Sequence, residues 1–430
     1  ANVLINDRIR EELLKGKALK HAISDGYKGS RAAIIDANVT TLLTAIILFS
    51  FGTGPIRGFA TTLIIGIASS LFTALFITRL YFEWRVRKSE KLPFSTKLTE
   101  KLFTNTNFSF LNFRKPAYIF SSILIIASLA SLLTKGLSLG VDFEGGRSYQ
   151  VRFDQSVEVA KISSSLELLF IDEDGRSFSP TVKTLGSPDQ VVITTNFRIS
   201  ENGSDVEESL RSQLFNGVKS FYLSDISESE FLNPPSDKAI GLVASRQVGP
   251  TVADDIKNTA FIAVIFSLLA IFLYLLFRFS KWQYSLGAVT ATIHDTIIVL
   301  GAYSILDGVL PFSLEVDQAF IAAILTVIGY SLNDTVVVFD RIREFFNLQS
   351  KDETKHKVID NALNSTLSRT FNTSATTIIV LLIIFVFGGE VLRGFIFAIL
   401  LGVVVGTYSS LFIASPVLND TTDRLSKKKI

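Results

Sequence analysis

The sequence predicts a polytopic α-helical membrane protein that carries one α+β domain outside the membrane. Its 430 residues are 48% hydrophobic and only 19% charged, and the mean hydropathy of +0.40 is typical of membrane proteins. Eight apolar runs have the length that a helix needs to cross the hydrocarbon core, about 20 residues. A single long polar insertion, Ser138–Asp255, interrupts the series. These three observations define the predicted fold class.

The predicted spans follow one another along the chain, and a stub at Ala1–Ile5 precedes them. The eight runs are Ile34–Phe51, Phe59–Phe82, Ala117–Leu133, Thr259–Phe279, Tyr284–Ile305, Ala319–Phe339, Thr370–Phe387 and Leu392–Pro416. Asp36, Asn38 and several Thr residues interrupt the first run, which is therefore the weakest of the eight.

Lys and Arg residues concentrate in alternate connections, and this bias predicts the orientation of the chain because basic short loops stay in the cytoplasm. The basic segments are Asp7–Arg31, Glu83–Lys115, Arg278–Trp282, Asp340–Lys357 and the C-terminal tail Asp423–Ile430. The connection Leu306–Gln318 has no Lys or Arg. We therefore expect the C-terminus in the cytoplasm and the insertion on the outer side of the membrane.

Alternation of apolar and polar residues within the insertion predicts four strands and two helices. The strands are Arg147–Asp154, Thr181–Gly186, Gln190–Phe197 and Ala239–Gly249, and the amphipathic helices are Ser156–Phe170 and Asp205–Val218. Their order is β-α-β-β-α-β, which is the order of the ferredoxin-like fold. The segment Phe221–Pro235 is not assigned to this pattern.

An internal repeat divides the membrane part into two related units. The motif DRIRE occurs at Asp7–Glu11 and again 333 positions later at Asp340–Glu344. The segment Phe51–Gly66 resembles Phe387–Gly402, 336 positions later, and a Thr-Thr pair precedes both copies. We expect residues 1–82 to match the last three helices of a six-helix unit, of which Ala117–Pro416 contains a whole copy. Duplicated bundles of this kind enclose a central site in many transporters.

The predicted boundaries follow from these features. Residues 1–82 form the membrane part of the first unit, and residues 83–116 form a cytoplasmic linker. The second unit begins with a transmembrane helix (117–137) and the extracytoplasmic α+β domain (138–255). A five-helix membrane bundle (256–417) and a basic cytoplasmic tail (418–430) complete it.

A carboxylate, Asp334, lies inside the predicted span Ala319–Phe339, six residues before the charged end of the helix at Asp340. At 1.5 Å per residue this places Asp334 about 9 Å into the bilayer. A charge at the centre of a membrane helix costs about 2.5–3.5 kcal/mol on insertion scales, so we expect Asp334 to have a function and a partner. Arg369 lies at a similar depth on the next helix, which packs antiparallel. Asp334 would be ionised when paired with Arg369 and would carry a proton when separated from it.

Other polar residues in the spans have structural as well as functional explanations. Arg369 can also be an anchor whose side chain reaches the membrane surface. His294 and Asp295, halfway along the span Tyr284–Ile305, form either a plain buried hydrogen bond or part of a proton relay. Asn333 and Asp36 are further relay candidates, and the position of Asp36 near the cytoplasmic boundary favours a structural role.

What the sequence lacks excludes several classes of function. There is no Cys, which excludes disulfides, thiol catalysis and Cys-based metal sites, and three His leave little for metal binding. No Walker motif or Ser/His/Asp order is present, and the glycine-rich stretch Gly140–Tyr149 precedes a strand instead of opening a helix. The net charge of +2 does not indicate a nucleic-acid partner. We therefore expect no enzyme activity, no cofactor and no metal.

These motifs together resemble the SecD/SecF family, which is part of the resistance–nodulation–division superfamily. The N-terminal stretch ANVLINDRIREELLKGKALKHAI and the segment Asp36–Ile67 are similar to the C-terminal end of SecD. The rest of the chain is similar to SecF from end to end, in the motifs GVDFEGG, ASRQVGPTVADDI, IGYSLNDTVVVFDRIRE, NSTLSRTFNTS and LRGFIFAILLGVVVGTYSSLF. The whole chain resembles a SecD–SecF fusion that lacks most of SecD.

The resemblance implies an auxiliary subunit of the Sec protein translocase, which uses the proton motive force to complete polypeptide export across the bacterial cytoplasmic (inner) membrane. Its partners would be the Sec translocation channel with its accessory membrane subunits, the unfolded exported polypeptide, protons and membrane lipids. Asp334 and Arg369 match an Asp and an Arg of the family's proton pathway, whereas the family's other essential Asp would precede Ala1. Two alternatives are a proton-coupled exporter of small or lipidic molecules from the same superfamily, and a membrane scaffold that moves no protons.

Overall fold

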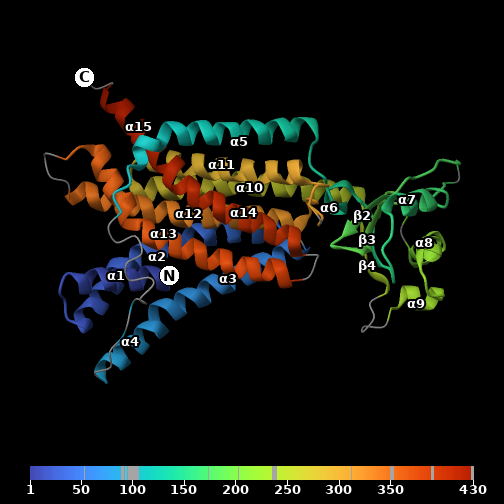
Figure 1. Ribbon diagram of the computed structural model, residues 1–430, viewed down its shortest axis with the longest axis horizontal. Coiled ribbons are helices and arrows are strands. Elements are labelled where there is room, and N and C mark those ends of the chain that lie inside the picture. The colour runs from blue at the N-terminus through green and yellow to red at the C-terminus, as the bar shows by residue number, and fades with distance from the viewer. Residues whose placement is uncertain are drawn as a thin grey trace.

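Long helices form a bundle, and the α+β domain lies at one end of it (Figure 1). The computed structural model describes residues 1–52, 54–88, 92, 94, 106–172, 174–201, 203–234, 240–310, 312–348, 353–388 and 392–427, with side chains for all of these except 54, 55 and 423–427. We call the end of the bundle that meets the α+β domain the proximal end and the opposite end the distal end. Helices α1 (Asn2–Leu14) and α15 (Ser415–Lys427) both lie at the distal end.

Eight helices of the described residues are long and apolar enough to cross a membrane, which confirms the predicted number. Six of them belong to the second unit and two to the first. The first-unit spans are α2 (Leu19–Phe51) and the continuous run of α3 (Gly54–Phe72), a π-helical turn η1 (Thr73–Ile77) and α4 (Thr78–Arg87). The second-unit spans are α5 (Arg114–Thr134), α10 (Pro250–Phe279), α11 (Trp282–Leu306), α12 (Gln318–Leu348), α13 (Lys355–Phe387) and α14 (Arg393–Ser409), which continues through the π-helical turn η5 (Ser410–Ala414) into α15.

Several helices begin earlier than the apolar pattern predicts. Helix α13 starts at Lys355 instead of the predicted Thr370. The hydroxyl of Thr354 caps this start by accepting a hydrogen bond from the backbone N–H of Lys357. Helix α2 starts at Leu19 instead of Ile34. Hydropathy detects the apolar part of a helix, whereas a cap marks where the helix begins, so the charged turns beyond the apolar run were not predicted. The extension places Arg369 in the middle of α13.

Helix α12 is the central element of the bundle, with more of its apolar window buried than in any other span of the described residues. It packs against α2 of the first unit and against α11, α13 and α14 of the second. Small residues permit these contacts, because a Cβ on Gly406 would lie 3.0 Å from the side chain of Ser331, and one on Gly329 would lie 3.1 Å from that of Thr41. The contact between Gly329 and Thr41 joins the two units.

The α+β domain has the predicted ferredoxin-like topology. Its strands are β1 (Gly146–Arg152), β2 (Thr181–Leu185), β3 (Ser187–Thr195) and β4 (Gly241–Val248), and its helices are α7 (Val159–Glu167), α8 (Ser204–Val218) and α9 (Glu228–Leu232), with a 3-10 turn η3 (Lys219–Phe221) after α8. All pairings are antiparallel, in the order β2-β3-β1-β4, and Tyr149 of β1 lies opposite Ile193 of β3. The three helices cover the sheet face that points away from the bundle (Figure 1). Helix α9, capped by Ser227, lies in the segment that the sequence pattern left unassigned.

The glycine-rich stretch between α5 and β1 attaches this domain to α12. A short helix α6 (Val141–Glu144) places the Asp142 carboxylate at the start of α12, where it accepts a hydrogen bond of 3.1 Å from the backbone N–H of Gln318. Gly145 and Gly146 follow α6 with φ of +74° and +139°, and a Cβ on Gly145 would lie 3.2 Å from Pro250. The glycines therefore serve a tight turn, which agrees with the poor match of this stretch to a nucleotide-binding loop.

The expected linker at residues 83–116 falls partly outside the described residues, since 89–91, 93 and 95–105 are not among them. Its described end, the 3-10 turn η2 (Phe110–Phe113), is joined to the distal part of α13. The side chain of Asp360 accepts a hydrogen bond from the Leu111 backbone, and Asn364 exchanges two hydrogen bonds with the backbone of Phe108. Of the expected basic tail, residues 428–430 lie outside the described part.

Candidate functional site

Asp334 and Arg369 lie on the neighbouring helices α12 and α13, and the interior of the bundle encloses both side chains. Asp334 is 3% exposed and Arg369 is 6% exposed. The Oδ2 atom of Asp334 and the Nε atom of Arg369 are buried, and neither has a hydrogen-bond partner in the described part of the chain. The two opposite charges attract each other across the contact between the helices. Burial in the middle of α13 does not fit an arginine that anchors a helix end at the membrane surface.

This arrangement limits the chemistry that the pair can perform. A carboxyl group can bind and release a proton, whereas a guanidinium stays charged in proteins. A buried charge is costly unless it is paired and hydrogen-bonded, so incomplete hydrogen bonding is expensive for both residues. The pair therefore suits a site in which Asp334 changes its protonation state and Arg369 responds to the change.

Further polar side chains of α12, α13 and α14 lie near the pair. Ser374 of α13 lies near Asp334 and forms a hydrogen bond of 2.6 Å with Thr407 of α14. Thr373 and Thr376 instead donate hydrogen bonds to carbonyl groups of their own helix. Asn333 is half-buried beside Asp334 and makes no side-chain hydrogen bond to any described residue. A pattern within one helix did not reveal Ser374 and Thr407 as partners, because their contact depends on how α13 and α14 pack.

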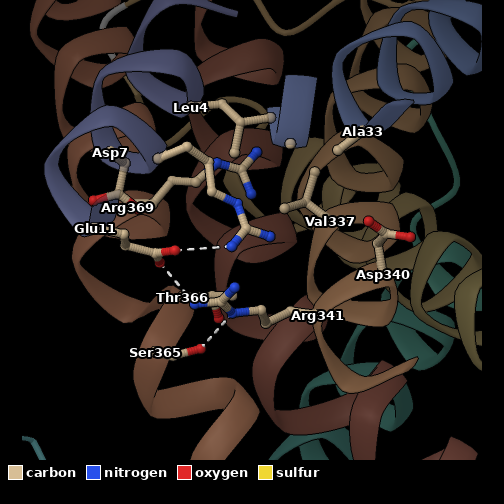
Figure 2. Close-up of a pocket in the computed structure, with 12 residues that line it drawn as sticks. Leu4, Asp7, Glu11, Ala33, Val337, Asp340, Arg341, Ser365, Thr366 and Arg369 are labelled. Atoms are coloured by element: carbon tan, nitrogen blue, oxygen red, sulfur yellow. Dashed lines mark hydrogen bonds and ion pairs between the residues drawn. The ribbon is translucent and has the colours of Figure 1, made fainter. Parts of the chain in front are cut away.

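A small polar cavity lies on the distal side of Arg369 (Figure 2). Its volume of about 20 Å³ is sufficient for one water molecule. Its lining consists largely of residues related by the repeat, which are Leu4 with Val337, Asp7 with Asp340, Arg8 with Arg341, Gly29 with Ser365 and Ala33 with Arg369. The two units therefore meet at this cavity as related copies. Arg369 enters it at the position where the first unit has Ala33.

The two DRIRE motifs meet at the distal wall of the cavity. Arg8 forms an ion pair of 2.8 Å with Glu344, and Arg341 forms one of 2.7 Å with Glu11. Within each helix the same residues pair again, Arg8 with Glu11 at 2.8 Å and Arg341 with Glu344 at 3.0 Å. We call these four residues the DRIRE ring.

Asp7 lines the same cavity from α1, next to the DRIRE ring. Burial raises the pKa of its carboxyl above the ordinary value, and the neighbouring Glu11 raises it further, against the opposing effect of Arg10, Arg369 and Arg341. The sequence pattern assigned no role to Asp7 or to the ring. The repeated DRIRE motif was the available signal for both, because its two copies have to be considered together.

His294 and Asp295 belong to a second buried polar network. His294 Nδ1 lies 2.8 Å from Asp295 Oδ1, and His294 Nε2 lies 3.0 Å from the hydroxyl of Ser121 on α5. The other oxygen of Asp295 accepts hydrogen bonds from Ser331 on α12 and Ser409 on α14. The network reaches α12 one turn before Asp334. Its hydrogen bonds are satisfied, which is consistent with a structural role, and its continuity from α5 to α12 is consistent with a relay.

Asp36 lies in an ion-pair cluster between α2, α10 and α12. Its carboxylate accepts hydrogen bonds from the hydroxyl of Tyr274 at 2.8 Å and from Arg278 Nε at 2.5 Å. Arg278 also reaches Asp340 at 3.4 Å. Asp36 therefore links the first unit to the second through Arg278. Asp36 is not among the described residues that line the Arg369 cavity, whereas Asp340 is.

Comparisons with known proteins identify relatives over the whole chain. The family model described as protein export membrane protein SecD/SecF, C-terminal, matches residues 1–87 and 231–424, and the SecD/SecF GG motif matches residues 130–157. The protein translocase subunit SecF of Rhodothermus marinus is 42% identical over 330 residues, which cover 76% of this chain and 98% of that protein. The protein translocase subunit SecDF of Thermus thermophilus is 35% identical over 421 residues, which cover 97% of this chain and 52% of that protein.

A solved structure agrees with the sequence relatives. The crystal structure of SecDF, a translocon-associated membrane protein from Thermus, aligns with a TM-score of 0.80 at 31% identity and covers 98% of this chain and 52% of that chain. The chain thus spans nearly all of a SecF relative but about half the length of the SecDF relatives. The fold and the extent of these matches confirm the resemblance that the motifs indicate, and the chain belongs to the SecD/SecF family of protein export membrane proteins.

Proposed function

We propose that this protein is an auxiliary subunit of the Sec protein translocase and that it uses the proton motive force to drive late steps of polypeptide export. The relatives' names, protein translocase subunit SecF and SecDF, support the assignment to translocation. The buried pair of Asp334 and Arg369 is the observation that supports proton use. Asp334 is a titratable group beside the fixed positive charge of Arg369, inside a helix bundle. Each of the two side chains has a buried polar atom without a hydrogen-bond partner among the described residues.

The proposed cycle alternates between two states of this pair. When Asp334 is ionised, Arg369 attracts it and α12 stays close to α13. When Asp334 binds a proton it becomes neutral, the attraction falls, and the helices can change their packing. The change in the protonation of one group is thereby converted into a movement of the helix that carries it.

Helix α12 is also the element that would transmit this movement to the α+β domain. The Asp142 carboxylate binds the first backbone N–H of α12, and the segment before α6 exchanges hydrogen bonds with Val316, just ahead of that helix. A shift of α12 would therefore move the domain, which we place on the outer side of the membrane with the emerging polypeptide. The basic distal end and the C-terminus would face the cytoplasm.

In this proposal the partners are the Sec translocation channel with its accessory membrane subunits, the unfolded polypeptide, protons and membrane lipids. The lipid contact would involve the exposed apolar side chains of the outer helices, such as Ile119, Ile123 and Ile126 of α5, which recur at helical spacing. Proton transfer at Asp334 needs no cofactor and no metal.

The decisive experiment replaces Asp334 by Asn, which keeps the shape of the side chain and removes the titratable group. In membrane vesicles that contain the protein and the Sec channel, we expect proton-gradient-dependent export to fall by about a hundredfold or more, the lower range for loss of a positioned proton-transfer group. Asp254→Asn, the same chemical change at an exposed position of α10, is the matched control and is expected to retain export. Normal export by Asp334→Asn, with normal protein levels, would exclude the proposal. Proton flux that requires a small apolar substrate, and not a polypeptide, would favour an exporter.

A further inference from the structure

We propose that the DRIRE ring is a gate that closes the distal side of the Asp334–Arg369 site. Arg8 and Glu11 come from the first unit, and Arg341 and Glu344 come from the second. The inference rests on the proposed function only where it concerns protons, because the opening and closing of the ring is a property of the fold.

The ring occupies a boundary between the interior and the solvent. Its side chains are 21% exposed for Arg8, 26% for Glu11, 13% for Arg341 and 40% for Glu344. Arg8, Glu11 and Arg341 also line the cavity that Arg369 enters. The ring is therefore partly exposed to solvent, and it also borders the cavity next to Arg369, where Figure 2 labels Glu11 and Arg341. In this proposal, a water molecule or ion reaches Arg369 from the distal end by passing the ring.

The pairing pattern makes the ring easy to open. Two of the ion pairs cross between the units, Arg8 with Glu344 and Arg341 with Glu11, and the other two lie within one helix each. When the units move apart, the crossing pairs break and each residue keeps its partner on its own helix. No charge is left unpaired in the open state, so opening avoids the large cost of an isolated charge. Partly exposed ion pairs are also individually weak.

The ring is connected to the helix that carries Arg369. Arg341 Nε donates a hydrogen bond of 3.0 Å to the hydroxyl of Ser365, one turn before Arg369 on α13. A shift of α13 relative to α12 therefore changes the position of Arg341 and with it the crossing pair to Glu11. This contact gives a physical route by which the state of the Asp334–Arg369 pair alters the gate.

The absence of Cys in the chain allows a direct test by thiol labelling. Ala33 is 5% exposed and lines the cavity behind the ring, so Ala33→Cys reports whether a water-soluble thiol reagent reaches it. We expect slow labelling from the distal side while the ring is intact. Neutralisation of both arginines, Arg8→Gln with Arg341→Gln, removes the crossing pairs and is expected to accelerate labelling by about tenfold.

A second variant separates a gate from a loss of fold. Reversal of all four charges, Arg8→Glu, Glu11→Arg, Arg341→Glu and Glu344→Arg, preserves every pair of the ring and is expected to restore slow labelling. Lys15→Cys, which replaces an exposed residue at the same end, should react at one fast rate in every background. Thermal unfolding of each variant checks that it is folded.

Two results would overturn the gate. One is an equal labelling rate of Ala33→Cys with the intact and the neutralised ring in folded protein. The other is fast labelling in the charge-reversed variant, which would show that the original side chains and not their pairing close the cavity. Labelling needs no proton gradient and no polypeptide, so it can fail while Asp334→Asn still abolishes export, and it can succeed if proton use is disproved.

Discussion

The two units of the membrane bundle share one framework but differ in their charges. Both contain the DRIRE helix end, a long second helix, the connection that resembles FGxxxxRGF, and a third helix with a π-helical turn, at Thr73–Ile77 and Ser410–Ala414. The position that corresponds to Asp334 in the first unit is Ala1, and the one that corresponds to Arg369 is Ala33. Within the residues of this sequence the repeat therefore conserves packing surfaces, and the pair of Asp334 and Arg369 belongs to the second unit.

The comparison separates residues that build the interface from residues that carry chemistry. Charges that both units retain, Arg8 with Arg341 and Glu11 with Glu344, pair with each other across the interface. Charges that one unit has and the other lacks belong to particular roles. Arg369 faces Asp334, and Asp36, whose counterpart is Asn372, fixes Arg278 of α10. Symmetry thus indicates assembly and asymmetry indicates function or a local clamp.

The largest expected effect, on export, comes from removing the charge of Arg369 and placing an arginine at the corresponding position of the first unit. Arg369→Gln should reduce proton-dependent export by about a hundredfold or more, because Asp334 loses the positive charge that controls its proton. The double variant Ala33→Arg with Arg369→Gln places an arginine at the same cavity from the opposite helix. We expect it to stay inactive, since α2 does not bring that arginine to Asp334. Export in vesicles measures both variants.

Arg369→Lys is the control for this prediction, because it retains a charge without the planar guanidinium and should keep part of the activity. Full recovery in the Ala33→Arg double variant would mean that the two units are interchangeable at this site, and the distinction drawn from the asymmetry would be wrong.

A smaller effect, on stability, is expected from the replacement of Asp36, the acidic residue of the first unit whose counterpart in the second unit is Asn372. Asp36→Asn removes the carboxylate that binds Arg278 and Tyr274 and leaves Arg278 with its longer contact to Asp340. Both side chains are largely buried, 11% exposed for Asp36 and 19% for Arg278, so the free energy of unfolding should fall by about 2–3 kcal/mol.

Denaturant unfolding in detergent, with the change of secondary structure as the signal, measures this loss. The protein that remains folded should still export in a proton-dependent manner. A complete loss of export at normal folded levels would instead place Asp36 among the proton-transfer residues.

The sequence predicted much of the fold because membrane helices and split βαβ domains have strong local patterns. The eight spans, the order of the four strands and the proximity of α12 to α13 all follow from periodicity and short connections. The start of α13 and the place of Arg369 in its middle did not follow, because the helix continues into a charged segment with its own cap at Thr354.

The contacts between the two units could not be predicted from the sequence, for a different reason. The DRIRE ring, the cavity and the link from Asp36 to Arg278 join residues that are hundreds of positions apart, and their geometry depends on how the two copies face each other. The repeat itself contained a usable signal, since each copy places Arg and Glu three residues apart, a spacing that puts opposite charges on one helix face. When the two helices bring these faces together, the Arg of each copy can pair with the Glu of the other copy.

The smallest expected effect, on stability, concerns two glycines that correspond in the repeat and so compares the packing of the two units. Gly66 and Gly402 occupy equivalent positions, but a Cβ on Gly66 would meet no atom within 4 Å, whereas one on Gly402 would collide with the side chain of Val327 on α12. Gly402→Ala should therefore lower the free energy of unfolding by about 1–2 kcal/mol through overpacking. Gly66→Ala should change it little or raise it by up to about 1 kcal/mol, because alanine favours the helix. If unfolding measurements gave the same loss for both variants, Gly66 would have to be packed as tightly as Gly402, and the difference between the two positions would be disproved.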